Sequence, residues 1–220
     1  MKKVSLLFSM MLMIAAPLFA QSEHGYIAGA GGFAITPQTT SGDALVEGGV
    51  RVAPHLMLFG DLGQYHNVQP SDVQPAIDST VAMLSSSQGL TTIGDGRVPA
   101  TYALGGLRYE IATSTRVTPY VLGGIGFAHL TPTAQFTYSS GTMPDGTTPT
   151  AGTDITSQLV NAGFFTAPAS SNAFMYTLGG GIQVPVATHW NVDVGYRFSR
   201  IAADTPLNAQ GATFGIGYRF

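Results

Sequence analysis

The fold is decided by the stretch Ala212-Thr213-Phe214-Gly215-Ile216-Gly217-Tyr218-Arg219-Phe220, where every second residue is large and apolar. The intervening residues are small or polar, and a period of two is typical of a β-strand with two different faces. A soluble sheet rarely finishes on an exposed row of aromatic and branched side chains. A strand with one face in lipid and an aromatic residue at the membrane interface can do so. The stretch therefore predicts a membrane-embedded strand.

Composition favours a membrane β-barrel over a helical membrane protein or a soluble enzyme. Only 10% of the 220 residues are charged and 28 are glycine, yet no interior apolar run approaches the roughly 18 residues that a membrane helix needs. Cysteine is absent, so neither a disulfide framework nor a thiolate metal site is available. A chain that begins near Gln21 carries seven arginines against twelve acids, a net charge of −5. We therefore expect no nucleic-acid partner and no cofactor.

Residues 1–20 have the pattern of a secretory signal peptide. Lys2 and Lys3 precede an apolar stretch over residues 4–19, and the small Ala20 follows it. We expect cleavage after Ala20, which leaves a barrel over residues 21–220. An uncleaved membrane anchor is the alternative, and the shortness of the apolar stretch disfavours it.

The remainder alternates between apolar-patterned segments and turn-rich connections. The pattern predicts eight strands, at about residues 25–35, 45–53, 56–65, 101–111, 117–128, 174–186, 190–199 and 211–220. Most have about ten residues, enough for a tilted strand to cross a bilayer. Short turns alternate with longer connections at 36–44, 66–100, 129–173 and 200–210. This alternation predicts an all-β fold, an eight-stranded antiparallel up-and-down transmembrane β-barrel with short periplasmic turns and long extracellular loops.

One face of most predicted strands is apolar and the other holds the charges. Val46, Leu107 and Val194 belong to the apolar face. The charged face carries Glu47, Arg51, Asp61, Arg108, Glu110, Asp193, Arg197 and Arg219. An eight-stranded barrel has an interior just wide enough for side chains, and buried charges are costly unless they are paired. We therefore expect a neutral salt-bridge network that closes the lumen, with a narrow, low-conductance pore as the alternative.

The hairpin turns give two charge pairings. Folding the last hairpin about residue 206 places Asp193 opposite Arg219. Folding the second and third strands about Pro54 instead sets Glu47 opposite Asp61, two like charges. Either Arg51 or Arg108 then lies between these carboxylates, or one carboxyl stays protonated.

Two segments carry a resemblance to a known family. The fifth strand, Thr118-Pro119-Tyr120-Val121-Leu122-Gly123-Gly124-Ile125-Gly126-Phe127, and the terminal Gly217-Tyr218-Arg219-Phe220 are similar to segments of small bacterial outer-membrane barrels of the OmpA transmembrane-domain and OmpX type. The resemblance implies a monomer in the Gram-negative outer membrane, in contact with lipid and lipopolysaccharide, with a structural or surface-contact role in envelope integrity or adhesion. It also implies that the outer-membrane assembly machinery recognises a C-terminal insertion signal formed by Phe214, Ile216, Tyr218 and Phe220.

The two longest loops, 66–100 and 129–173, are where we expect an unidentified ligand to bind, because rigid scaffolds carry function on their loops. Residues 76–84 have the spacing of a short amphipathic helix. Residues 129–173 are rich in Thr, Ser, Ala, Pro and Gly, which predicts a flexible or weakly β segment.

Two further classes of protein are weighed against this interpretation. The five histidines show no catalytic or metal-binding spacing, so we expect no enzymatic activity. A secreted soluble barrel with an apolar pocket, as in lipocalins, requires the charged face outside. The low charge content disfavours it, as does an expected aromatic girdle. That girdle comprises Tyr109, Trp190 and Phe220 at the periplasmic end and Tyr102, Phe127, Phe174 and Phe198 at the outer end.

Overall fold

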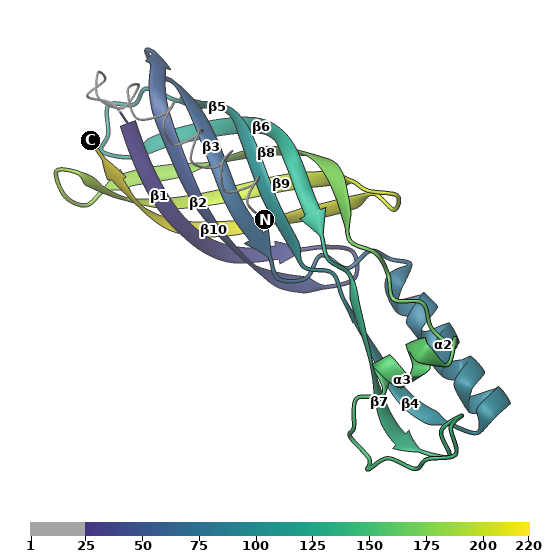
Figure 1. Cartoon of the computed structure of the whole chain (residues 1–220). Helices are drawn as coiled ribbons and strands as arrows, with labels where there is room; N and C mark the ends of the chain where they lie inside the picture. The colour runs from purple at the N-terminus through teal and green to yellow at the C-terminus, as the bar shows by residue number, and fades with distance from the viewer. Residues whose placement is uncertain (1–24) are drawn as a thin grey trace, which may run out of the picture.

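The computed structural model describes residues 25–220 and contains a closed β-barrel with a smaller domain at one end (Figure 1). The barrel strands are β1 (Gly25–Ile35), β2 (Thr40–Ala53), β3 (Leu56–Tyr65), β5 (Ala100–Glu110), β6 (Thr118–Leu130), β8 (Ser171–Pro185), β9 (Trp190–Ala202) and β10 (Leu207–Arg219). Their order around the barrel is β1-β10-β9-β8-β6-β5-β3-β2, and neighbouring strands are antiparallel. This confirms the predicted eight-stranded up-and-down barrel. The predicted signal peptide, residues 1–20, lies outside the described residues.

The last strand closes the barrel against the first. β10 pairs with β1 from Tyr26↔Arg219 to Ile35↔Gln210, and Gly25 and Phe220 exchange two backbone hydrogen bonds of 2.9 and 3.0 Å. Glycine permits close strand contact elsewhere in the wall. A Cβ added at Gly126 would lie 2.0 Å from the carbonyl oxygen of Ala103 on the neighbouring strand. The glycine-rich strands therefore suit the tight curvature of a narrow barrel.

The outer wall of the barrel is apolar. Exposed large apolar side chains project from all eight barrel strands, among them Ile27, Val46, Leu58, Leu107, Ile125, Leu178, Val194 and Phe214. Of the predicted girdle, Tyr109 and Trp190 are about half exposed and pack near other rings at one rim. Tyr102 is not part of a girdle, because its side chain is 3% exposed and points into the lumen. The alternation that puts Leu107 and Tyr109 outside places Tyr102 inside, so the girdle assignment was wrong there.

The two ends of the barrel differ in their connections. At one end, here called the turn end, residues 54–55, 111–117 and 186–189 join the strands and Gly25 lies beside Phe220. At the opposite end, the loop end, two connections expected to be long are short, at residues 36–39 and 203–206. The strands continue there because inward-facing Ser41 and Asp43 keep the strand alternation without apolar residues. The predicted connections at 36–44 and 200–210 were therefore too long.

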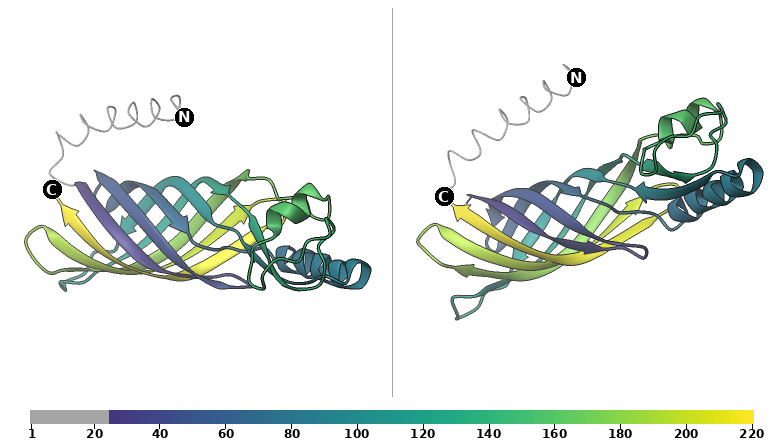
Figure 2. Two further views of the ribbon diagram at one scale, coloured as in Figure 1. Left: turned by 60° about the horizontal axis from the view of Figure 1, so that its bottom comes forward. Right: turned by 90° about the horizontal axis from the view of Figure 1, so that it is seen from below.

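The other two connections fold together into a domain that projects from the loop end (Figure 2). This outer domain, residues 69–97 and 133–170, contains α2 (Val73–Gln88), β4 (Thr91–Arg97), β7 (Thr133–Ser140) and α3 (Thr156–Asn161). The predicted helix at 76–84 is confirmed within the longer α2. The prediction of a weakly β segment at 129–173 agrees with β7, but the segment also supplies α3 and part of a core, which the sequence analysis did not predict. Neither α2 nor α3 is long and apolar enough to cross a membrane.

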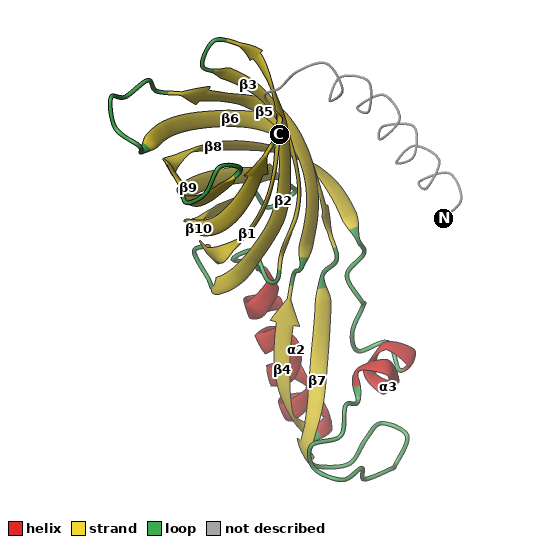
Figure 3. Ribbon diagram, turned by 90° about the vertical axis from the view of Figure 1, so that its left-hand side faces the viewer, coloured by secondary structure: helices red, strands yellow, loops and turns green. Residues whose placement is uncertain are grey.

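The outer domain has its own apolar core, separate from the barrel. β4 and β7 form a two-stranded ribbon, with α2 along β4 and α3 beside β7 (Figure 3). α2 approaches β4 so closely that a Cβ at Gly94 would lie 2.3 Å from Ile77. The core consists of the buried side chains Ile77, Leu84, Leu90, Phe136, Tyr138, Met143, Ile155 and Leu159. The Thr205 hydroxyl joins the barrel to the outer domain by donating to Asp72 at 2.9 Å, and Val73 packs against both the outer-domain core and the apolar cluster in the barrel.

Candidate functional site

Charged side chains fill the middle of the barrel. We call Glu47, Asp61, Arg108, Asp193 and Arg197 the central network. Arg108 contacts Glu47 at 3.0 Å and Asp193 at 3.3 Å, whereas Arg197 bridges Glu47 and Asp61. The two bridged carboxylates are 3% and 2% exposed. Each carboxylate in this low-dielectric space thus has a guanidinium partner, as buried charge requires.

Two tyrosines complete the central network. The hydroxyl of Tyr26 donates to Glu47, and that of Tyr120 donates to Asp193 at 2.7 Å. The guanidinium of Arg108 lies 3.5 Å from the centroid of the Tyr120 ring. Arg108 therefore has carboxylates at its edge and an aromatic face beside it, an arrangement that suits a planar cation.

A second group of charges lies nearer the turn end. Glu110 accepts from Arg51 at 3.0 Å through one carboxylate oxygen and from Arg219 at 2.9 Å through the other. Arg219 also donates to Gln183. We call Arg51, Glu110 and Arg219 the lower cluster. No ion pair within residues 25–220 joins it to the central network.

The register confirms that Glu47 lies opposite Asp61, but the cation beside them is not one of the two expected. The cation that bridges these two carboxylates is Arg197. Of the two, Arg108 forms an ion pair with Glu47 only, and Arg51 forms an ion pair with neither.

The predicted pair between Asp193 and Arg219 was wrong. Asp193 lies opposite Gly215, because Ile201 pairs with Leu207 and the hairpin is centred on residue 204 rather than 206.

Several interior polar residues escaped the sequence analysis. Asp43 is 8% exposed inside the barrel, where the Tyr102 hydroxyl lies 3.4 Å from its carboxylate. It shares the alternation of Glu47 and Arg51, so the period of two could have found it if the strand had been extended. The uncharged Gln183 also points inward, and it shares the period of two with the buried Thr177 on the same strand. Asn191 is buried as well, on the face that the alternation assigns to Asp193 and Arg197.

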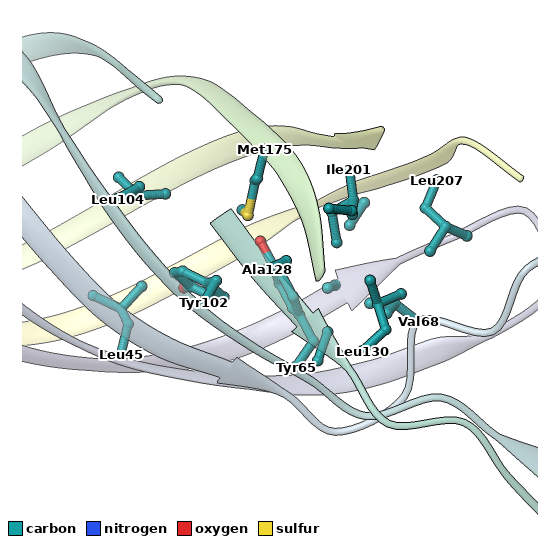
Figure 4. Close-up of a cluster of buried hydrophobic side chains, with 14 of the residues drawn as sticks. Leu45, Tyr65, Val68, Tyr102, Leu104, Ala128, Leu130, Met175, Ile201 and Leu207 are labelled. Carbon is teal, nitrogen blue, oxygen red and sulfur yellow. The ribbon is translucent and has the colours of Figure 1, made fainter. Parts of the chain in front are cut away.

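Apolar side chains fill the lumen near the loop end (Figure 4). Met175 and Ile201 are 0% exposed and lie with residues from the bases of the outer-domain connections, Val68 and Leu130. Other members of this apolar plug are Leu45, Tyr65, Val98, Tyr102, Leu104, Ala128 and Leu207. The lumen thus changes along its axis from an apolar plug at the loop end, through the central network, to the lower cluster at the turn end.

The described residues offer no metal site. Within 25–220 there is no group of three or more His, Asp or Glu side chains arranged to hold a metal ion. His129 contacts Asn172 at 2.8 Å on the exposed rim.

An apolar outer wall around a charged interior defines an integral membrane β-barrel. Comparison with known families agrees: the family described as "Outer membrane protein beta-barrel domain" matches residues 5–220. The chain belongs to this family. Outer-membrane barrels have short periplasmic turns, so the turn end faces the periplasm and the outer domain faces the cell exterior.

The solved structures with a similar fold include three outer-membrane barrels. Neisserial surface protein A is similar at a TM-score of 0.54 and 14% identity, over 90% of this chain and 98% of that one. Ail of Yersinia pestis is similar at a TM-score of 0.46 and 15% identity, over 90% of this chain and 97% of Ail. The N-terminal barrel domain of Pseudomonas aeruginosa OprF is similar at a TM-score of 0.45 and 13% identity, over 89% of this chain and 97% of that domain. A comparison with curated protein sequences finds no match.

Proposed function

We propose that the protein is a non-enzymatic outer-membrane anchor whose closed barrel holds a folded outer domain away from the membrane for contact with another surface. The observation that carries this proposal is the separate core of the outer domain, built around Phe136 and Leu159, which are both 0% exposed. A loop that only joined two strands would not need a core of its own. Adhesion or a structural role in the envelope is the function that follows.

The filling of the lumen supports an anchor rather than a pore. The side chains of Met175 and Ile201 are 0% exposed in the apolar plug at the loop end, and the charges of the central network are paired with one another nearer the turn end. A conducting path needs both layers to separate, which breaks buried ion pairs. The inward-facing charges and outward-facing apolar side chains also argue against a lipocalin-like soluble barrel, which requires apolar side chains inside and charged ones outside.

The proposed contact surface is the face of the β4–β7 ribbon that the helices leave uncovered. Its most exposed large apolar side chain is Ile93, at 65%. The face is completed by the exposed side chains of Thr91, Asp95, Arg97, Thr133 and Gln135. The outer domain contains five aspartates and one arginine, a net charge of −4. We expect it to favour a neutral or basic protein surface over a polyanion.

Adherence of whole cells to a cultured epithelial monolayer tests this proposal. Cells that express the protein are compared with matched cells that lack it and with cells that carry Ile93→Glu. We expect Ile93→Glu to reduce adherence several-fold, because it places a charge at the centre of the contact surface. Ser86→Glu is the matched control, since it adds the same charge on the exposed side of α2. Equal adherence with and without the protein, or equal effects of the two variants, would contradict the proposal.

Assembly and environment belong to the same proposal. The outward Phe214 and Ile216, with Tyr218 and Phe220 nearer the periplasmic rim, are 36–58% exposed and would serve as the C-terminal signal for the assembly machinery. The apolar wall would contact lipid and lipopolysaccharide as a monomer, after removal of residues 1–20.

A further inference from the structure

Arg200 is the one basic side chain that the described barrel strands direct toward lipid. Its neighbours on β9, Ser199 and Ile201, are 1% and 0% exposed in the lumen, so the strand alternation places Arg200 on the outer wall. The other arginines of the barrel strands, Arg51, Arg108, Arg197 and Arg219, face inward. A charge on the outer wall is costly at the bilayer midplane and is tolerated near the interface.

The position of Arg200 along β9 places it at the outer edge of the apolar band. Trp190 lies at the turn-end rim on the same face of the same strand, ten residues earlier. Ten strand residues span roughly 33 Å, and a tilt of about 35–45° reduces this to roughly 25 Å along the membrane normal, about the height of the apolar band in outer-membrane barrels. The outward residues between them are Val192, Val194, Tyr196 and Phe198. Arg200 therefore lies level with the headgroups on the outer side.

Arg200 is the middle of a row of three hydrogen-bonding side chains on neighbouring strands. Tyr176 on β8 and Asn208 on β10 pair with it in register, and β8, β9 and β10 lie side by side in the wall (Figure 1). We call Tyr176, Arg200 and Asn208 the rim row. All three residues are partly exposed.

The rim row has accessible donors without partners. Within it, Nη1 of Arg200 donates to Oδ1 of Asn208 at 3.4 Å. Nε and Nη2 of Arg200, Nδ2 of Asn208 and the Tyr176 hydroxyl have no hydrogen-bond partner among residues 25–220, and none of these four atoms is buried. The row thus presents N–H and O–H groups to whatever covers the wall at this depth.

The wall around the rim row provides no counterion. The outward residues two positions away on the three strands are uncharged: Phe174, Leu178, Phe198, Ala202 and Gln210. The nearest acids belong to the loop end beyond the strands. Asp204 lies in the β9–β10 turn, and Asp72 accepts from Thr205. Neither forms an ion pair with Arg200, so its charge is free for a ligand at the level of the headgroups.

We propose that the rim row binds a phosphate of lipid A, the headgroup region of lipopolysaccharide in the outer leaflet. The planar guanidinium matches phosphate oxygens in pairs, and the hydroxyl and amide on either side supply further donors. Basic side chains at headgroup depth attract anionic lipids. This site rests on the lipid environment proposed above for the outer wall and is independent of the contact surface on the outer domain.

Two forms of one lipid test the site. The folded, full-length protein in neutral detergent micelles is titrated with lipid A that carries both phosphates, or with the same lipid A after its phosphates are removed. Native mass spectrometry measures the fraction of protein with lipid bound. We expect the phosphorylated form to bind about tenfold or more tightly than the dephosphorylated form, since the acyl chains contribute equally to both.

Variants locate the site. Arg200→Gln should remove the preference for the phosphorylated form, and Tyr176→Phe, which keeps the charge and the ring, should weaken that preference by about threefold. Arg116→Gln is the matched control, because it removes the same charge from an exposed turn at the opposite end of the barrel. A heat-dependent shift in gel mobility verifies folding, and Tyr176→Phe carries the test if Arg200→Gln fails to fold. Without lipid A, Arg200→Gln should unfold in urea as the parent protein does.

The outcomes separate this site from the contact proposal. Equal binding of the two forms of lipid A overturns the site, as does a preference that survives both variants or falls equally in Arg116→Gln. Loss of adherence in Ile93→Glu bears only on the contact surface, whereas loss of the phosphate preference in Arg200→Gln bears only on the rim row.

Discussion

Arg197 is the side chain on which the central network depends most. Its guanidinium bridges Glu47 and Asp61, and no other basic side chain among the described residues forms an ion pair with Asp61. Replacing Arg197 with Met keeps much of the volume of the stem and removes the charge. Asp61 would then lie 2% exposed, next to a second carboxylate and without a cation. Breaking a buried pair in this way costs about 3–5 kcal/mol, so we expect the free energy of unfolding to fall by that amount.

Urea unfolding in detergent–lipid micelles measures this loss, followed by Trp190 fluorescence and by gel mobility with and without heating. Arg200→Met is the matched control, because the Arg200 side chain donates one hydrogen bond, to Asn208 at 3.4 Å, and forms no ion pair in the described part of the chain. We expect that control to cost less than about 1 kcal/mol. Asp61→Asn added to Arg197→Met should recover most of the loss, because it removes the uncompensated charge. If Arg197→Met is as stable as Arg200→Met, the network does not hold the barrel shut.

Three further changes test other parts of the molecule. Phe136→Ala leaves a cavity in the core of the outer domain and should destabilise that domain by about 3–5 kcal/mol. Limited proteolysis should then cut the outer domain while the heat-dependent gel mobility of the barrel persists. Loss of the protease resistance together with the mobility shift would mean that the outer domain and the barrel do not fold separately. Leu107→Arg puts a charge on the outer wall and should destabilise the barrel by about 2–4 kcal/mol if that wall lies at the bilayer midplane; an unchanged urea midpoint would place Leu107 outside lipid. Hydrogen bonds from the hydroxyl and the backbone N–H of Thr156 hold the pKa of Asp154 below its usual value, so its stabilising contribution is present above the ordinary carboxyl pKa and is lost as the pH falls through the lowered value. The protease resistance of the outer domain in Asp154→Asn should lack this dependence, and identical pH profiles would refute it.

The barrel was predictable because its strands repeat one local signal. The alternation of Phe214, Ile216 and Tyr218 with small residues fixes which face is apolar, and the same period of two assigns Glu47 and Asp61 to the lumen. Within the predicted strands, charged residues marked the inward positions correctly, whereas bulk alone misplaced Tyr102. Where polar residues such as Ser41 and Asp43 continued a strand, the pattern faded and the predicted strand ended too early.

Register inside the lumen depends on turn geometry, which the alternation does not specify. Moving the centre of the last hairpin from 206 to 204 keeps every side chain on its face and still removes Asp193 from Arg219. The position of Arg197 between two carboxylates is also invisible in a single hairpin, since Glu47, Asp61 and Arg197 come from three strands.

The outer domain was missed for a different reason. Its core joins Ile77 and Leu84 from one connection to Phe136 and Leu159 from the other. Each connection alone is polar and rich in small residues, so neither has enough apolar residues to predict a fold. Only the pairing of β4 with β7 brings the two halves together.

Planar-bilayer recording of the folded, full-length protein tests the central claim most directly. A lumen filled by the Met175–Ile201 plug and by the central network predicts no stable current steps across physiological voltages. Reproducible steps that disappear when the sample is boiled, and that change in Arg197→Met, would contradict a closed anchor and identify the protein as a pore.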